Sequence, residues 1–459
     1  MVGGWLDNQR KLVSVAEPED TPIDVETLNT EQRRLFDIAK EVIDQSVAGG
    51  EPTQKLVDVC GAAGTGKSYV IRAIRQYAIG QTGKENSVRI AAPTGSAAAL
   101  LPSGRTLHSL LHIRAEDSFR EHEEPLVGNQ LADIQESFAD TLILIIDEKS
   151  MVGSGRLSQI MRRLRQARPD IEPDVLFGGL SVILVGDVRQ LPPVADNAAF
   201  LPVKGMKVQN EGRDLFRQFN ISVCLTESHR QKSDPAFAAQ LERLAAGETT
   251  EADWDKWTER SYENLSDKDR EIMDMSAIKL CSTRAATADF NTRNLIRTGQ
   301  PAVKISAVNS DKEAAKATTK KAKNLAGCVT LSKDSLVVLT TNLWTAAKLC
   351  NGSTGFIKLI IYHEKESASA GHRPAMVVVD FPAYIGPALF PDHPTWVPIT
   401  AVTKNWWEKQ KQMSRTQFPL MLGWSLTIHK SQGGSHLACT PHDHYCRHDA
   451  QPCDHRHWR

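Results

Sequence analysis

The sequence predicts an α/β fold in which helices cover both faces of a parallel sheet, followed by a small antiparallel β-barrel. Short apolar runs recur at 56–60, 88–92, 142–146 and 182–185, and polar turns and helical stretches separate them. Buried strands that alternate with helices are typical of a parallel sheet. From Ser335 onward, runs rich in β-branched, aromatic and other apolar residues alternate with Gly, Pro and Ser residues, and this pattern favours antiparallel strands.

The composition is typical of globular proteins and limits the classes of function. The chain has 459 residues, of which 41% are hydrophobic and 24% charged; this length suggests roughly two to four domains. No apolar run approaches the roughly 18 residues of a membrane-spanning helix, and the N-terminus has no signal-peptide or transit-peptide pattern. We therefore expect an intracellular protein without disulfides and without a membrane partner.

Charge is balanced overall but uneven along the chain. The 55 Lys and Arg residues equal the 55 Asp and Glu residues, so a nucleic acid would have to bind at local patches. Eight acidic residues and one Arg lie between Glu116 and Asp140, which predicts a surface segment away from phosphates. Six Lys residues lie between Pro301 and Leu325, and a solvated loop explains them better than a specific phosphate site does.

The first elements are a leader and an amphipathic helix. Residues 1–26 are polar and are expected to form a flexible leader. After Leu28, apolar residues share one helical face, and Asn29 or Thr30 is expected to be the N-cap. The apolar face consists of Leu35, Ile38, Ala39, Val42 and Ile43.

A complete G-x-x-x-x-G-K-[ST] motif follows the first strand and begins a helix, as phosphate binding requires. Its glycines allow successive backbone N–H groups to face phosphates, and the helix N-terminus adds partial positive charge. Lys67 is expected to neutralise the β- and γ-phosphates, and Ser68 to bind Mg²⁺. The alternative is a Gly-rich turn that matches by chance. The expected ATP-binding residues of this P-loop are Gly61, Ala62, Ala63, Gly64, Thr65, Gly66, Lys67 and Ser68.

Two further strand ends are expected to complete an ATPase site. The apolar run 142–146 ends in Asp147 and Glu148. Asp147 is expected to hold Mg²⁺ through water, and Glu148 to orient and deprotonate the attacking water. The strand at 181–186 is followed by Gln190, which either senses the γ-phosphate or is only a polar turn residue. Together the three motifs predict ATP hydrolysis, with ATP and Mg²⁺ as cofactors.

Eight motifs occur in an order that resembles the PIF-type DNA helicases, relatives of bacterial RecD within helicase superfamily one. The resemblance spans about 28–434, is greatest to the fungal PIF-like group and the helicase portions of Helitron transposons, and includes a similar stretch at 339–355. The motifs are LNTEQ (28–32), GAAGTGKS (61–68), AAPTGSAAALL (91–101), GRTLHSLL (104–111), IIDEKSM (145–151), GDVRQLPPV (186–194), LTESHRQ (225–231) and FPLMLGWSLTIHKSQG (418–433).

This resemblance implies two RecA-like P-loop NTPase domains with parallel sheets, ATP in the cleft between them and single-stranded DNA across their tops. The first domain would cover 27–205, with a small insertion at about 112–140 that corresponds to the family's strand-separating element. The second would cover 206–434, with a β-barrel insertion at about 345–415. Residues 435–459 would be an aberrant or disordered tail.

The resemblance also implies functional roles for residues at matching motif positions in this sequence. Gln32 would read the adenine edge and Arg230 would be an arginine finger; the residues alone allow a helix N-terminal role for Gln32 and a surface role for Arg230. Hydroxyl, basic and ring side chains suit a translocase that follows a DNA backbone, although such residues also pack in strands, caps and cores. The DNA contacts implied by the resemblance are Pro93, Thr94, Thr106, His108, Thr283, Thr340, His429 and Lys430.

Two features depart from the family pattern. Lys149 stands where the family usually has a small or apolar residue, and this cation either lowers the basicity of the neighbouring carboxylates or points to solvent. After HKSQG, no block resembles the family's closing arginine motif, and Cys439, Cys446 and Cys453 are each separated by six residues. That spacing does not suit zinc, so a frame shift, a splice error or decay of a mobile element is the expected origin of the tail.

The leading functional hypothesis is an ATP-dependent DNA helicase that moves 5′ to 3′ on single-stranded DNA and acts on duplex or forked DNA. DNA repair, recombination or telomere-type maintenance would be its setting. One alternative is a truncated ATP- and DNA-binding protein with little helicase activity, because a lost arginine contact slows hydrolysis by orders of magnitude. Another is a fragment of a Helitron-type transposase. We expect a monomer, in the nucleus or else the mitochondrion.

Overall fold

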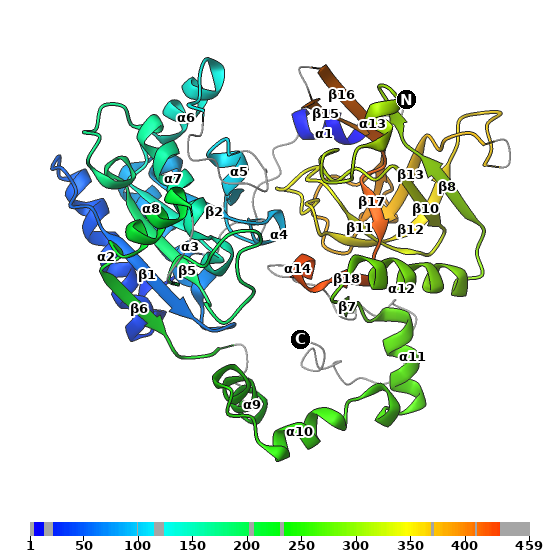
Figure 1. The fold of residues 1–459 in the computed structure, drawn as a ribbon, viewed down its shortest axis with the longest axis horizontal. Coiled ribbons are helices and arrows are strands. Elements are labelled where there is room, and N and C mark those ends of the chain that lie inside the picture. The colour runs from blue at the N-terminus through cyan, green and yellow to red at the C-terminus, as the bar shows by residue number, and fades with distance from the viewer. Residues whose placement is uncertain are drawn as a thin grey trace. The chain divides into compact units, whose positions relative to one another are not determined.

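The computed structural model describes residues 4–12, 22–98, 100–113, 124–201, 206–229, 234–368, 371–408 and 411–431. It divides into two compact units, which Figure 1 draws. The P-loop unit comprises Glu17–Thr258, and the C-terminal unit comprises Glu259–Arg459 together with Met1–Ala16. No helix in the described parts of the chain is long and apolar enough to cross a membrane.

The P-loop unit is built on a six-stranded sheet in the order β3-β2-β4-β5-β1-β6. Every pair of neighbouring strands in this sheet is parallel, so the predicted α/β class with a parallel sheet is confirmed. The strands are β1 (Leu56–Gly61), β2 (Val88–Ala92), β3 (Arg105–Thr106), β4 (Ile143–Ile146), β5 (Ser181–Gly186) and β6 (Ile221–Leu225).

Helices cover both faces of this sheet because alternate strand residues point to opposite sides. On β5, Ile183 and Val185 belong to the core cluster that includes residues of α2 and α3, whereas Val182 and Leu184 belong to the cluster under α6 and α7. The helices of this unit are α2 (Thr30–Val47), α3 (Lys67–Thr82), α4 (Gly95–Ala98), α5 (Leu107–Leu110), α6 (Asn129–Phe138), α7 (Ser154–Ala167), α8 (Lys207–Phe216), α9 (Pro235–Ala246) and α10 (Glu251–Thr258).

The acidic segment at 116–140, predicted to lie on the surface, has both exposed and buried side chains in its described part. Its helix α6 buries Ile134 and Phe138 in the core cluster that includes residues of α7, while Asp133 and Asp140 remain exposed. The prediction was therefore right for the acidic side chains, but the helix itself belongs to the core of the unit.

The C-terminal unit is mainly antiparallel, as the texture after Ser335 predicts. Its sheets have the orders β14-β13-β12-β11-β17, β15-β16-β9 and β10-β8, with Val337, Val377 and Val379 in one core cluster. The strands are β8 (Ala302–Ser306), β9 (Val308–Asn309), β10 (Cys328–Ser332), β11 (Leu336–Leu339), β12 (Thr354–Ile361), β13 (Met376–Asp380), β14 (Trp396–Ile399), β15 (Val402–Glu408), β16 (Lys411–Gln417) and β17 (Leu420–Leu422).

Parallel pairing in the described part of the C-terminal unit is confined to β7 (Lys279–Cys281) and β18 (Ser425–Thr427). The amide of Asn291 joins this pair to a helix by donating to the backbone oxygens of Leu422 and Ser425. The helices of this unit are α1 (Trp5–Leu12), α11 (Asp267–Ser276), α12 (Arg284–Arg297), α13 (Lys312–Lys316) and α14 (Ile428–Ser431).

The division between the units differs from the one expected at 205/206. It falls after Thr258, because β6 adds to the edge of the first sheet by pairing with β1. The leader is also not wholly flexible. In its described part, Leu6 of α1 packs against the core of the C-terminal unit, and Arg10 Nη1 donates to the Leu343 carbonyl at 2.9 Å. The expected tail at 435–459 lies outside the described residues.

Candidate phosphate-binding site

The P-loop connects β1, which lies between β5 and the edge strand β6, to the N-terminus of α3 through left-handed glycines. Gly64 and Gly66 have φ of +83° and +79°, values that favour glycine. A Cβ atom on Gly66 would lie 2.3 Å from Nε2 of Gln32, so the loop also needs glycine for space. The 16-residue helix α3 begins directly at Lys67, and its free N–H groups make this a ready anion site.

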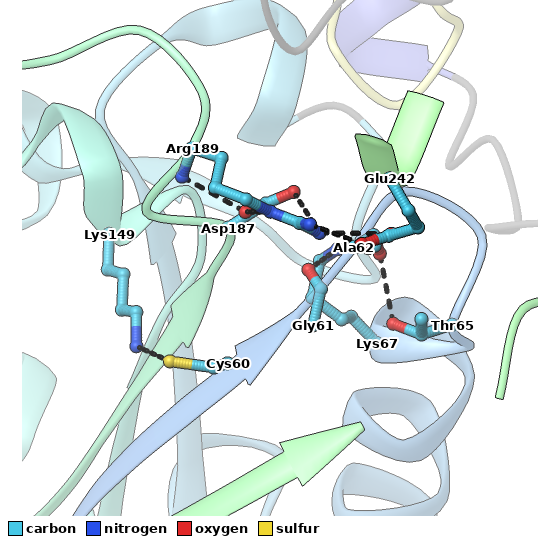
Figure 2. Close-up of polar contacts among 9 residues, drawn as sticks. All are labelled: Cys60, Gly61, Ala62, Thr65, Lys67, Lys149, Asp187, Arg189 and Glu242. Carbon is cyan, nitrogen blue, oxygen red and sulfur yellow. Dashed lines mark hydrogen bonds and ion pairs between the residues drawn. The ribbon is translucent and has the colours of Figure 1, made fainter. Parts of the chain in front are cut away.

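Lys67 and Thr65 hold the loop in shape from within. Lys67 Nζ donates to the backbone oxygens of Gly61 at 2.9 Å and Ala62 at 2.8 Å, and Figure 2 shows both contacts. Thr65 Oγ1 donates to the same Ala62 oxygen at 3.0 Å. The ammonium of Lys67 therefore lies at the loop, where phosphate oxygens would replace its carbonyl partners.

Gln32 combines the two roles considered for it. Its Oε1 accepts from the N–H of Asn29, which completes a capping box at the start of α2 and makes Asn29 the N-cap. Its Nε2 donates to the Thr65 carbonyl at 3.1 Å, and the side chain is buried. An amide offers two donors and two lone pairs, so one donor and one lone pair remain for an adenine edge.

The acidic pair follows β4 at the same edge of the sheet. Asp147 is buried, and its N–H donates to the Ala91 carbonyl at 2.9 Å. Burial raises the pKa of Asp147, against the opposing effects of the Glu148 N–H and the charge of Lys67. Glu148 has a left-handed backbone, with φ of +54°. A hydroxyl such as that of exposed Ser68 and a buried carboxylate form a donor set that suits Mg²⁺.

The turn after β5 carries an ion-pair network that the sequence did not predict. Gln190 closes this turn by donating its N–H to the Asp187 carbonyl at 3.1 Å. Between them, Arg189 pairs with Asp187 at 3.1 Å and with Glu242 of α9 at 2.6 Å, as Figure 2 shows. The turn is therefore tied to a helix that follows 53 residues later.

Two contacts near the site were not identified from the sequence, that of His229 with the P-loop and that of Lys149 with β1. Arg230 lies outside the described residues, but His229 just before it donates its N–H to the Gly64 carbonyl at 2.8 Å. The side chain of Lys149 is buried and contacts Asp58 and Cys60 of β1 rather than solvent. A signal for this contact existed in the sequence, since Asp58 is the one charged residue in the apolar run LVDVC.

The implied DNA contacts of the P-loop unit lie at neighbouring strand ends. Pro93 and Thr94 follow β2, and Ala92 pairs with Thr106 of β3. Both threonines also cap short helices: Thr94 Oγ1 accepts from Ala97, and Thr106 Oγ1 accepts from Ser109. Burial, with a smaller effect of Arg156, lowers the pKa of His108 to about 4.

The implied contacts of the C-terminal unit are less uniform. Thr283 caps α12 through a 3.1 Å hydrogen bond from Ala286. Thr340 follows β11, and its hydroxyl is buried without a hydrogen-bond partner among the described residues. His429 and Lys430 lie in α14, but their side chains are outside the described part. The contact role of all these residues stays a prediction.

A P-loop, an acidic strand end and a polar turn at one edge of a parallel sheet define a P-loop NTPase with a RecA-like fold. Residues 27–251 match the model of a family described as PIF1-like helicase. This match agrees with the resemblance to the PIF-type helicases that the ordered motifs carry.

Several relatives and solved structures resemble the chain. It is 26% identical to the ATP-dependent DNA helicase PIF1 of Xenopus laevis over 434 residues, which are 94% of this chain and 60% of that protein. The crystal structure of Pif1 helicase from Candida albicans has a TM-score of 0.61 at 24% identity and covers 88% of this chain and 86% of that one.

A Pif1 helicase from Bacteroides in complex with ADP-AlF3 and single-stranded DNA has a TM-score of 0.58 at 24% identity, with coverage of 88% and 84%. These structures share the fold of this chain. The chain spans between 46% and 60% of the length of three curated PIF-type relatives that it matches.

Proposed function

We propose that this protein is an ATP-dependent DNA helicase that translocates 5′ to 3′ on single-stranded DNA and opens duplex or forked DNA. The observation that carries the proposal is the meeting of Lys67, Asp147 and the Gln190 turn at one edge of the parallel sheet. The names of its relatives support the same activity. We further propose a monomer that acts in DNA repair or recombination in the nucleus.

The P-loop unit supplies the groups needed for hydrolysis of the γ-phosphate. Backbone N–H groups of 61–68 and the ammonium of Lys67 would bind the phosphates, and Ser68 with Asp147 would hold Mg²⁺. When bound, Mg²⁺ polarises the phosphate oxygens and neutralises developing charge. Glu148 would take a proton from the attacking water, and Gln190 would respond to loss of the γ-phosphate.

DNA would be engaged by residues at the ends of β2 and β3 and by the C-terminal unit. Hydroxyl groups such as those of Thr94 and Thr106 bind a phosphate backbone without reading bases. A Bacteroides relative holds single-stranded DNA and an ATP analogue together, which supports coupling of the two ligands here.

An ATPase and unwinding assay tests the proposal. The expected result is ATP hydrolysis that single-stranded DNA stimulates, and unwinding of a fork with a 5′ tail but not of one with only a 3′ tail. Lys67→Ala should abolish both activities. Lys84→Ala is a matched control, because Lys84 is an exposed lysine of the same unit that pairs with Asp140. Binding of ATP and DNA without turnover would contradict the helicase assignment.

A further inference from the structure

A buried lysine links the acidic turn after β4 to the strand that carries the P-loop. Lys149 is the first residue of the turn Lys149–Met151, directly after Glu148. Its ammonium forms an ion pair with Asp58 and lies 3.1 Å from Cys60 Sγ, the contact that Figure 2 draws. Lys149 is only 6% exposed, so the pair is largely shielded from water.

The contact crosses one whole strand of the sheet. The sheet order β4-β5-β1 places β5 between the turn that holds Lys149 and the strand that holds Asp58. At the end of β5, a Cβ atom on Gly186 would lie 2.7 Å from the backbone nitrogen of Lys149. The missing side chain of Gly186 thus lets the turn pack directly on β5, and the lysine reaches past it to β1.

The residue held by this anchor is the expected general base. Glu148 has φ of +54° and ψ of +46°, a left-handed conformation that non-glycine residues keep only when their surroundings enforce it. Backbone hydrogen bonds fix the turn on one side, from Met151 to the Glu148 carbonyl at 3.1 Å and from Val152 to the Lys149 carbonyl at 2.9 Å. The ion pair with Asp58 fixes it on the other.

We propose that Lys149 is a positioning residue for ATP hydrolysis, which holds Glu148 at the P-loop through its buried pair with Asp58. The inference rests on the proposed function and adds a residue where the family pattern has a small or apolar one. A small or apolar side chain would avoid the cost of burying a charge. In this chain, the matched cation and carboxylate set the register between the acidic turn and β1.

The test compares single and paired substitutions. Lys149→Met and Asp58→Asn each remove half of the pair, and the double variant Lys149→Met/Asp58→Leu replaces it with apolar groups, which commonly restores folding stability. We expect kcat for ATP to fall by about tenfold or more in all three, since small misplacement of a reacting group costs that much. KM and binding of a fluorescent ATP analogue should change by less than about twofold, and Lys149→Arg should regain part of kcat.

Arg243→Met removes the partner of another buried aspartate, Asp253, so it reports the general effect of breaking a buried pair. A double variant that regains both thermal stability and wild-type kcat would show that the pair is only structural and would overturn the inference.

A second readout does not depend on activity. Amide hydrogen exchange of the peptide 147–152 should become faster in Lys149→Met and in the double variant, and unchanged protection would also overturn the inference. If the wild-type chain proves to have no ATPase activity, the proposed function fails, whereas the exchange measurement still decides whether Lys149 anchors the turn.

Discussion

Arg189 joins the turn that carries Gln190 to helix α9 through a 2.6 Å ion pair with Glu242. The helix begins at Pro235, shortly after the expected arginine finger, so the pair mechanically connects two segments that would both respond to the γ-phosphate. The hydrogen bonds that Arg189 donates to the carboxylates of Glu242 and Asp187 raise the pKa of its guanidinium.

We predict that Glu242→Gln uncouples these segments without unfolding the protein. Exposed ion pairs contribute less than about 1 kcal/mol to the free energy of unfolding, and Glu242 has 62% side-chain exposure. The measurement is the ratio of ATPase rates with and without single-stranded DNA, which should fall severalfold. Glu248→Gln, an exposed change just after the same helix, is the control, and an unchanged ratio in Glu242→Gln would contradict the prediction.

Gly66→Ala should abolish nucleotide binding, because its Cβ would collide with Gln32 as well as strain the left-handed backbone. Gly83 ends the same helix with φ of +67° and has no atom within 4 Å of an added Cβ. Gly83→Ala should therefore lower the free energy of unfolding only by the strain of a left-handed alanine, about 1–2 kcal/mol, and leave ATP binding intact. Titration with a fluorescent ATP analogue distinguishes the two variants, and equal affinities would refute the steric argument.

His108 should make the P-loop unit less stable in mild acid. Its pKa of about 4 in the folded chain is below the ordinary value of 6.5, so the unfolded chain takes up a proton first as the pH falls. The contribution of neutral His108 to the free energy of unfolding is fully present above about pH 6.5 and is lost as the pH falls toward 4. Between pH 7 and pH 5 the contribution is about 2 kcal/mol. In denaturant titrations, His108→Gln should reduce the stability lost over that interval; identical losses would oppose the assignment.

Arg415 should be essential for the structure of the lysine-rich segment. It is 1% exposed and donates to the backbone oxygens of Ala314 at 2.8 Å, Ala317 at 2.9 Å and Leu325 at 3.1 Å. Arg415→Met would leave these carbonyls unsatisfied and should lower the free energy of unfolding by about 3 kcal/mol. Faster tryptic cleavage within 312–323 is the readout, with the exposed Lys333→Met as control. A segment as resistant as in the wild type would disprove the role of Arg415.

The parts of the fold that depend on local pattern were predicted correctly from the sequence. Strands β1, β2, β4 and β5 are short apolar runs, and the P-loop needs only adjacent residues to define its turn. The N-cap of α2 was expected at Asn29 or Thr30, and Asn29 occupies it. Such features carry their own signal because their hydrogen bonds join near neighbours.

Features that depend on distant partners were not predicted. The compact P-loop unit extends past the expected boundary at 205/206, because β6 pairs with β1 across the sequence. The lysine side chains of 301–325 are exposed, as a solvated segment predicts, but the contacts that organise its backbone come from Arg415, which lies 90 or more positions away. Lys149 looked ambiguous because its partner Asp58 is 91 residues earlier. In each case the deciding contact joins residues that are far apart in the chain.

The docking of α1 on the C-terminal unit constrains the order of events during synthesis. Arg10 and its acceptor Leu343 are 333 residues apart, so α1 leaves the ribosome long before its docking surface exists. The P-loop unit is a single continuous stretch of chain, Glu17–Thr258, so it can fold meanwhile. The first helix must therefore wait as an unpaired segment until the antiparallel strands are translated, and closure of this long loop is a late step of folding.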